Sequence, residues 1–402
     1  MFRDYYMRNY KHNSSIPKIE QREFGFIMFE SWMQRHKSFK QIEELKDFLQ
    51  KYVPSDAYYS SAYYKYPEAE MDRKEWLGAD LIFDIDADHI PTPCAKIHDG
   101  WVCSCCGFSR NGVTPKKCPN CGGEKFNVHT WPCEVCLSSA KAETLKLLDI
   151  LTEDFGFSET DIHIFFSGHR GYHIQIDSDA VKTLDAVARK EIVDYVSSLG
   201  IDVFSHGLNR EYEGKRILFS SFVLENNLGW SRRIIEGMQN FIANMKEEDF
   251  KSIGLEKNII DNLVNNKDSI SRNLLNAKAS TFVKGIGLET WRKIAEYIIQ
   301  LKSAKIDTVV TTDVHRLIRL ADTLHGKTGF KKVEFPISAI HTFDPFKDAI
   351  AFKGGTATVN VSNAPEFRVG DEKFGPYKNQ KVELPIAAAL LLICKGRAEV
   401  VI

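Results

Sequence analysis

The chain has 402 residues, of which 43% are hydrophobic, and its formal net charge is −1 at pH 7. This composition predicts a soluble globular protein that buries a large core in a main domain with insertions, and it excludes a globally basic chain that binds nucleic acid tightly and alone. Any nucleic acid is therefore expected to bind weakly, in one cleft, with help from metals or a partner. The longest apolar run, Leu384 to Cys394, contains Pro385 and is about half the length that spans a bilayer, so it predicts a buried strand or helix. The first residues show no apolar core of a signal peptide.

An aromatic segment, Tyr58 to Tyr66, is the first feature along the chain. Its tyrosines could stack on bases. Alternating tyrosines are also ordinary strand residues with one face buried, and this second interpretation is preferred.

The run from Leu81 to Asp88 is an apolar strand that ends in alternating carboxylates. Residues two apart on a strand point to the same face, so Asp84 and Asp86 are expected side by side. The repulsion between them predicts a pair of divalent metals, as in enzymes that transfer phosphoryl or nucleotidyl groups. A solvated strand end is the alternative for such a motif in isolation.

Eight of the nine cysteines fall between Cys94 and Cys136. Two Cys-x2-Cys pairs predict a zinc ribbon with four thiolate ligands, Cys103, Cys106, Cys118 and Cys121. The flanking residues predict a second tetrahedral zinc site formed by Cys94, His98, Cys133 and Cys136. His129 could replace His98, and Cys105 could replace Cys103 or Cys106. An iron–sulfur cluster is a further alternative, but paired knuckles fit zinc better.

Two helices are predicted on either side of a glycine-flanked turn. They span Ala140 to Phe155 and Ala180 to Leu199, and each has an apolar stripe and ends before a glycine. Between them, Ser167 to His173 lies between two strand-like segments. Its glycines let backbone amides approach an anion, while Ser, His and Arg supply donors and charge, so we predict a phosphate site. A hairpin turn with exposed polar residues is the alternative.

The region from about 207 to 300 is rich in helical patterning and charge. Downstream of it, Asp307, Arg316, Arg319 and the turn Leu324 to Gly329 repeat the combination of carboxylate, arginines and a glycine-flanked His/Lys turn. Three dispersed clusters of this kind predict a nucleotidyl-transfer site assembled from distant parts of the chain.

Together these motifs resemble the small, catalytic subunit of archaeal and eukaryotic DNA primases. The resemblance covers nearly the whole chain in the family's order. It rests on Tyr5-Tyr6, Gln21 to Phe26, Phe83 to Asp86, Cys133 to Cys136, Ser167 to His173, Leu324 to Gly329 and Phe343 to Phe346.

Matched position by position, the resemblance implies a catalytic triad for Mg²⁺ or Mn²⁺ at Asp84, Asp86 and Asp307; Asp313 matches no acidic position of the family. The residues that it implies for the incoming nucleoside triphosphate are Ser167, His169, Arg170, His173, Arg319 and His325. His169 is arginine in eukaryotic relatives, so its charge depends on pH. Glu23 and Arg35 match residues that position the initiating nucleotide, whereas Met33 stands where a tyrosine is expected.

The resemblance also implies a mixed α+β fold, with central sheets flanked by helices. The primase-polymerase catalytic core would comprise residues 1–92, 138–206 and 301–402, with a zinc-binding insertion at 93–137 and a mainly helical insertion at 207–300.

The implied activity is template-dependent synthesis of short RNA or DNA primers on single-stranded DNA by a two-metal mechanism. The implied partners are a large primase subunit, nucleoside triphosphates and the replicative helicase and polymerase, at replication forks in the archaeal cytoplasm.

Three alternatives compete with this interpretation. A repair-type primase-polymerase would use the same three carboxylates to extend existing primers. A haloacid dehalogenase-like phosphatase also has Asp-x-Asp after a strand, but Asp88 stands where that family has Thr or Val. A non-catalytic zinc-ribbon module would leave the acidic and basic clusters unexplained.

Overall fold

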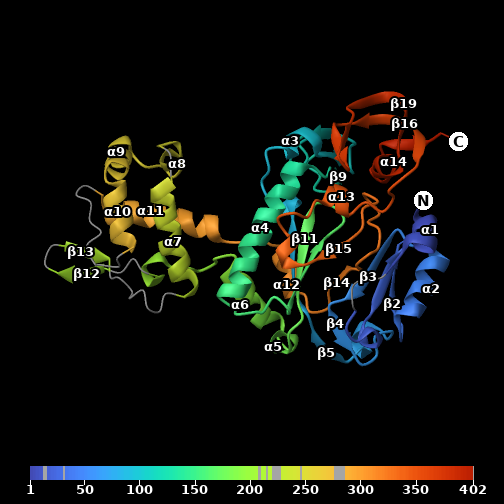
Figure 1. The fold of residues 1–402 in the computed structure, drawn as a ribbon, viewed down its shortest axis with the longest axis horizontal. Helices are drawn as coiled ribbons and strands as arrows, with labels where there is room; N and C mark the ends of the chain where they lie inside the picture. The colour runs from blue at the N-terminus through green and yellow to red at the C-terminus, as the bar shows by residue number, and fades with distance from the viewer. Residues whose placement is uncertain are drawn as a thin grey trace. The chain divides into compact units, whose positions relative to one another are not determined.

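The computed structural model describes residues 1–11, 16–29, 32–206, 210–213, 216–219, 228–244, 247–275 and 286–401. The chain folds into two compact units (Figure 1). The first contains Met1–Thr144, Ser158–Lys190 and Lys305–Ile402, and the second contains Leu145–Phe157 and Glu191–Ala304. Helices and strands occur in both units, which confirms the predicted mixed α+β class. Among the described residues, no helix is long and apolar enough to cross a membrane.

An antiparallel four-stranded sheet carries the N-terminal part of the first unit. Its strand order is β14 (Leu317–Arg319), β3 (Asp56–Ser60), β1 (Phe24–Ile27) and β2 (Met33–Lys37). Buried apolar side chains of these strands pack with helix α2 (Ile42–Tyr52) and with the N-terminal turns α1 (Phe2–Asp4) and η1 (Tyr5–Asn9). The register pairs Arg319 with Tyr58, so this sheet joins segments far apart in the sequence.

The tyrosine-rich segment forms β3 and β4 (Ala62–Tyr64), and β4 pairs with β5 (Trp76–Ala79). The prediction of strands is confirmed, but burial is not confined to one face, because the neighbouring Tyr63 and Tyr64 of β4 are both buried. In the sequence, the short helix η2 (Ile19–Gln21) precedes β1, and η3 (Met71–Arg73) lies between β4 and β5.

A second antiparallel sheet has the order β15 (Val333–Phe335), β10 (Ile162–Phe166), β11 (Gly171–Ile176) and β6 (Leu81–Asp86). In β6, Leu81, Ile82, Phe83 and Ile85 are buried, and the two aspartates between and after them are only partly buried. The register places His173 opposite Asp84 and Gly171 opposite Asp86. The predicted strand with alternating carboxylates therefore lies beside the predicted phosphate turn. After β6 the chain continues as η4 (Ala87–His89).

A buried ion pair joins the two sheets. Arg22 and Asp80 are fully buried, and their side chains are 2.6 Å apart. Arg22 also donates to the carbonyl oxygens of Ser60 and Ser61, while Asp80 accepts from Gln175 of β11. Because each charge has several partners, burial does not leave either one uncompensated.

The predicted helices differ from those in the structure at their ends. Helix α4 (Glu134–Glu153) begins before the predicted start at Ala140. The sequence pattern missed its first turn, because that turn faces the cysteine cluster and adds nothing to the apolar stripe. The single helix predicted from Ala180 to Leu199 is wrong: the chain forms α5 (Asp179–Lys182) and α6 (Ala186–Val196). The Asp185 carboxylate accepts the Ala188 N–H at 2.8 Å and so begins a new helix.

The cysteine-rich segment lies in the first unit. It contains α3 (Ala95–His98) and a small sheet of order β8 (Ser109–Asn111), β7 (Gly100–Cys103) and β9 (Phe126–His129). Trp101 packs against Phe126 with ring centroids 5.2 Å apart and forms the small core of this sheet.

The C-terminal part returns to strands. A three-stranded sheet has the order β19 (Tyr377–Pro385), β16 (Thr356–Ala364) and β20 (Ala398–Val400), and β17 (Phe367–Val369) pairs with β18 (Glu372–Phe374). Helices α12 (Thr308–Thr312), η7 (Ile337–Ala339) and α13 (Pro345–Asp348) precede them. The apolar run after Pro385 is the largely buried helix α14 (Ile386–Cys394), as predicted for a core segment.

In the second unit, the helices after η5 (Val203–His206) are α7 (Gly229–Asn244), α8 (Glu247–Ser252), α9 (Lys257–Asn265), α10 (Lys267–Leu275) and α11 (Leu288–Lys302). Trp230 and Trp291 are buried in their shared core. Strands β12 (Arg210–Glu213) and β13 (Arg216–Phe219) form a hairpin. Within the predicted helical insertion, residues 207–209, 214–215, 220–227, 245–246 and 276–285 lie outside the described residues.

Candidate active site and metal centres

A cavity of about 180 Å³ lies in the first unit, where the C-terminal end of β6 meets β11 and β14. Seven of the predicted site residues line it: Asp84, Asp86, Ser167, His169, His173, Arg319 and His325. They come from three separate segments of the sequence, 84–86, 167–173 and 319–325. The sheet pairings described above therefore assemble most of the predicted site in one place.

The predicted third carboxylate, Asp307, lies next to this cavity. Its backbone N–H donates to the carbonyl oxygen of Asp84 at 2.8 Å, and its side chain caps α12 by accepting the Val309 N–H. Burial, together with the charges of Asp86 and Asp307, raises the pKa of Asp84 to about 7. Burial also raises the pKa of Asp86. The carboxylates thus repel one another in the absence of a cation, and oxygen donors of this kind suit Mg²⁺ or Mn²⁺.

The turn from Ser167 to Gly171 is shaped by its two glycines. Gly168 has a φ of +86°, which favours glycine, and a Cβ on Gly171 would lie 2.2 Å from the carbonyl oxygen of Ile85. The Ser167 hydroxyl accepts the N–H groups of His169 at 3.3 Å and Gly171 at 3.2 Å. The turn is therefore fixed by its own hydrogen bonds against the end of β6.

Three histidines face this cavity. Burial lowers the pKa values of His169, His173 and His325 well below the ordinary value of a histidine, so all three are neutral at pH 7. The rings of His169 and His325 stack at 5.1 Å, and Nε2 of His173 lies 3.4 Å from Asp84. Nδ1 of His325 accepts the Lys327 N–H at 3.1 Å, which leaves the proton of the neutral ring on Nε2.

Arg170 does not line the cavity, although it belongs to the same turn. Its side chain is 2% exposed and donates to both carboxylate oxygens of Asp99, at 2.9 and 2.8 Å. It also forms an ion pair with Asp88. Its charge is thus engaged by protein carboxylates.

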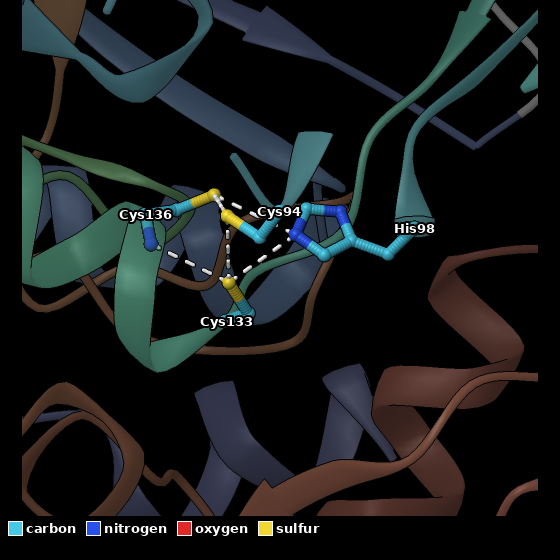
Figure 2. A group of neighbouring side chains, drawn as sticks. All are labelled: Cys94, His98, Cys133 and Cys136. Atoms are coloured by element: carbon cyan, nitrogen blue, oxygen red, sulfur yellow. Dashed lines mark hydrogen bonds between the residues drawn. The ribbon is translucent and has the colours of Figure 1, made fainter. Parts of the chain in front are cut away.

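Figure 2 shows Cys94, His98, Cys133 and Cys136 converging from α3 and the start of α4. Sγ of Cys94 lies 3.4 Å from Sγ of Cys136 and 3.5 Å from Sγ of Cys133, and Nε2 of His98 lies 3.2 Å from Sγ of Cys133. A tetrahedron with metal–sulfur distances of about 2.3 Å has sulfur–sulfur edges of about 3.8 Å. These four residues could therefore hold a zinc ion after a small expansion.

The second predicted set, Cys103, Cys106, Cys118 and Cys121, also converges. Sγ of Cys103 lies 3.6 Å from Sγ of Cys121, and Sγ of Cys106 lies 3.7 Å from Sγ of Cys118. Each pair begins a tight turn, in which Gly107 and Gly122 donate to the carbonyl oxygens of Cys103 and Cys118. His129 and Cys105, the alternative ligands, belong to neither set.

Known proteins of one family match this chain over almost its entire length. The sequence profile described as DNA primase small subunit matches residues 129–337. The chain is 31% identical over 400 residues to a DNA primase small subunit from Nitrosopumilus maritimus, covering 99% of this chain and 96% of the relative. It is 33% identical over 417 residues to one from Methanococcoides burtonii, with coverages of 99% and 96%. The subunit from Methanothrix thermoacetophila is 32% identical over 419 residues, with coverages of 99% and 97%.

The chain belongs to the DNA primase small subunit family. It is therefore a primer-synthesising nucleotidyltransferase, and the resemblance inferred from its motifs is confirmed. The phosphatase and the non-catalytic zinc module are excluded as its function.

Two further predicted residues of this primase lie outside the cavity lining. Glu23 and Arg35 form a bidentate pair, with distances of 2.9 and 3.1 Å. Although burial favours the neutral acid, the hydrogen bonds from Arg35 and from the His36 N–H lower the pKa of Glu23 below its ordinary value. Glu23 is fully buried and Arg35 is partly exposed, so Arg35 is the member of the pair that a ligand can reach.

Tyr58 and Arg316, which the sequence motifs include without a role at the site, also line the primase cavity. Two lysines beside it were missed from the sequence, and Nζ of the first, Lys395, lies 2.8 Å from Nε2 of His169. Lys332 is fully buried and donates to the carbonyl oxygen of Arg319 at 2.8 Å. Burial lowers the pKa of both lysines to about 7. Lys395 gave no signal because it follows an apolar helix, whereas Lys332 could have been found from its closeness to the Leu324 to Gly329 turn.

Proposed function

We propose that this primase subunit holds two divalent cations, Mg²⁺ or Mn²⁺, between Asp84, Asp86 and Asp307, and joins nucleotides on a single-stranded DNA template. The observation that carries the proposal is the meeting of these carboxylates with the Ser167–Gly171 turn at one cavity. The raised pKa of Asp84 and of Asp86 supports it, because a bound cation would stabilise both charged forms. When bound by these carboxylates, two such cations would supply Lewis-acid chemistry, lowering the pKa of a 3′-hydroxyl and stabilising pyrophosphate as a leaving group.

The triphosphate of the incoming nucleotide would be held by Ser167, His169, His173, Arg319 and His325. Neutral imidazoles donate N–H groups without adding charge repulsion, and His325 would use its Nε2–H. Positive charge would come from Arg316 and Lys395, and from Arg319, which lines the cavity although it also pairs with Asp56. Fully buried Lys332 would add charge from behind the cavity wall. Arg170 would act by keeping the turn in place, since its guanidinium is bound to Asp99 and Asp88.

Initiation would use a second position next to Arg35. Glu23 orients the guanidinium of Arg35 through two hydrogen bonds, and the exposed part of this side chain would meet the initiating nucleotide. A short RNA or DNA primer would then grow from this position.

The two Cys/His sets would each hold a Zn²⁺ ion. Both sets supply four ligands, so the ions would be structural or contact the template. We further propose a large primase subunit as the partner, with the replicative helicase and polymerase at archaeal replication forks.

The test is primer synthesis on single-stranded DNA with labelled ribo- or deoxynucleotides and Mg²⁺ or Mn²⁺, with and without a preformed primer. Asp86→Asn and Asp307→Asn should each abolish product formation. Asp313→Asn is the matched control, because its carboxylate accepts the His315 N–H and lies outside the cavity lining. Full activity of Asp307→Asn would refute the metal triad. Products that require a preformed primer would favour the repair-type alternative or a need for the large subunit.

A further inference from the structure

Asp99 follows the metal-ligand candidate His98 in sequence and is almost completely buried. Its carboxylate has partners on two sides. One side faces the Cys94/His98/Cys133/Cys136 set, called here the knuckle site, and the other faces the nucleotide-binding turn. No prediction from the sequence singled out Asp99.

On the knuckle side, Oδ1 of Asp99 lies 2.8 Å from Nδ1 of His98. Nε2 of the same ring points at the sulfur atoms, 3.2 Å from Cys133 and 3.7 Å from Cys136 (Figure 2). A ring bound to metal through Nε2 donates its Nδ1–H, and a carboxylate that accepts this proton orients the ring and raises its basicity. Asp99 occupies that position.

On the other side, Nη1 of Arg170 donates to both oxygens of Asp99. The same nitrogen donates to the carbonyl oxygen of Trp131 at 3.3 Å and approaches Sγ of Cys136 at 3.8 Å. Asp99 also accepts the Trp131 N–H at 3.0 Å. The guanidinium is therefore held against the knuckle site.

Arg170 in turn contacts the segment that follows Asp86. Its Nη2 pairs with Asp88, and its carbonyl oxygen accepts the Ala87 N–H at 3.3 Å. Arg170 is also the residue between His169 and Gly171 in the turn. A shift of this side chain would move both Asp86 and the amides of the turn.

We propose that Asp99 is a positioning residue that couples metal binding at the knuckle site to nucleotide binding, through Arg170. The proposal rests on the proposed role of the Ser167–Gly171 turn. Loss of the carboxylate would misorient His98 and leave the buried charge of Arg170 with one partner fewer. In contrast, the side-chain hydrogen bonds described for Cys103, Cys106, Cys118 and Cys121 stay within their own ribbon.

The first experiment compares Asp99→Asn with the wild-type protein by zinc competition against a pyridylazo-resorcinol indicator. One of two bound ions should be held about 10- to 100-fold more weakly, the usual effect of removing such a carboxylate, while the other keeps its affinity. Glu334→Gln is the matched control. It removes an equally short His–carboxylate contact, 2.8 Å to His163, in a place without cysteines.

The second readout is the equilibrium affinity for a labelled nucleoside triphosphate with Mg²⁺. It should fall several-fold in Asp99→Asn and stay unchanged in Glu334→Gln. Linkage between two sites is reciprocal, so saturating nucleotide should tighten zinc at one site of the wild-type protein and not in Asp99→Asn.

The wild-type linkage measurement needs no variant, so it tests the proposal even if Asp99→Asn fails to fold. Zinc affinity that is independent of nucleotide, or a zinc defect in Asp99→Asn without a nucleotide defect, would overturn the coupling. Failure of the proposed function would be recognised separately, as a wild-type protein that binds no nucleotide but retains both ions.

Discussion

Asp84 and Lys395 carry opposite charges when ionised, yet burial brings the pKa of each to about 7. The same burial keeps three histidines neutral. Without ligands, the site therefore disfavours the ionised carboxylate and the protonated lysine, which are the forms that bind metal ions and phosphates. Divalent cations and a triphosphate would restore those charges, so we expect nucleotide and metal binding to be linked to proton exchange.

Asp84→Asn should abolish nucleotidyl transfer, because it removes a ligand atom, and should also change the pH dependence of stability. The pKa of Asp84 is raised by folding, so between about pH 4 and pH 7 the unfolded chain holds fewer protons and stability falls as pH rises. We expect thermal melts without added Mg²⁺ or Mn²⁺ to show a smaller decrease of Tm from pH 5 to pH 8 in Asp84→Asn than in the wild type. Equal slopes would contradict the raised pKa.

Lys395→Gln should raise the KM for nucleotide about 10-fold at pH 7, because a cationic donor at a phosphate site contributes on the order of 1.5 kcal/mol. In the wild type, Lys395 loses its proton as pH rises through about 7, so KM should increase from pH 7 to pH 9. Lys395→Arg keeps the charge and should flatten this increase. Steady-state kinetics at each pH would test this, and a KM profile unaffected by Lys395→Gln would exclude the contribution.

At the scale of elements, the close approach of β11 to β6 sets the distance between the nucleotide-binding turn and the carboxylates. Gly171 is required at the crossing point, where the Ile85 carbonyl oxygen leaves no room for a side chain. Both strands are otherwise rich in buried apolar residues, which fixes their register because a slip by one residue would expose them.

Gly171→Ala should therefore destabilise the protein by about 2–4 kcal/mol and lower activity, since the two backbones must separate. Gly354→Ala is the control, because a Cβ there meets no atom within 4 Å and its φ is not positive. Urea unfolding of both variants measures the difference. A Gly171→Ala variant as stable as Gly354→Ala would show that the strands can separate at little cost.

At the scale of the whole molecule, the candidate active site and the cysteine-rich segment belong to the same unit, although their residues come from different parts of the sequence. The knuckle site joins residues on either side of the ribbon and lies against the turn through Arg170. Metal occupancy and catalysis are thus expected to depend on one another.

We expect the purified protein to contain two zinc ions by mass spectrometry of the metal. Cys133→Ser should retain one, since a closed four-ligand site loses most of its affinity with one thiolate. Cys105→Ser is the matched control and should retain two, because Cys105 is exposed and belongs to neither set. Loss of an ion from Cys105→Ser would mean that the ribbon uses a different ligand set.

The family, the mixed fold class, the strand that carries Asp84 and Asp86, and both cysteine sets could be predicted from the sequence alone. These features depend on short-range patterns, namely alternation along a strand, the spacing of knuckles and motifs in a fixed order. Helix ends were less predictable. The first turn of α4 faces the cysteine cluster, and α6 begins at the capping carboxylate of Asp185, and neither feature produces a periodic apolar pattern.

Which side chains share the cavity could not be predicted from the sequence, because it depends on how distant elements pack. Lys395 meets His169 because α14 ends there, and Arg170 turns away because Asp99, distant in sequence, accepts its hydrogen bonds. Such contacts, and the pKa shifts that burial causes, arise from packing between elements that no local pattern specifies. Charge and donor types can thus be read from the chain, whereas their partners and protonation depend on the folded interior.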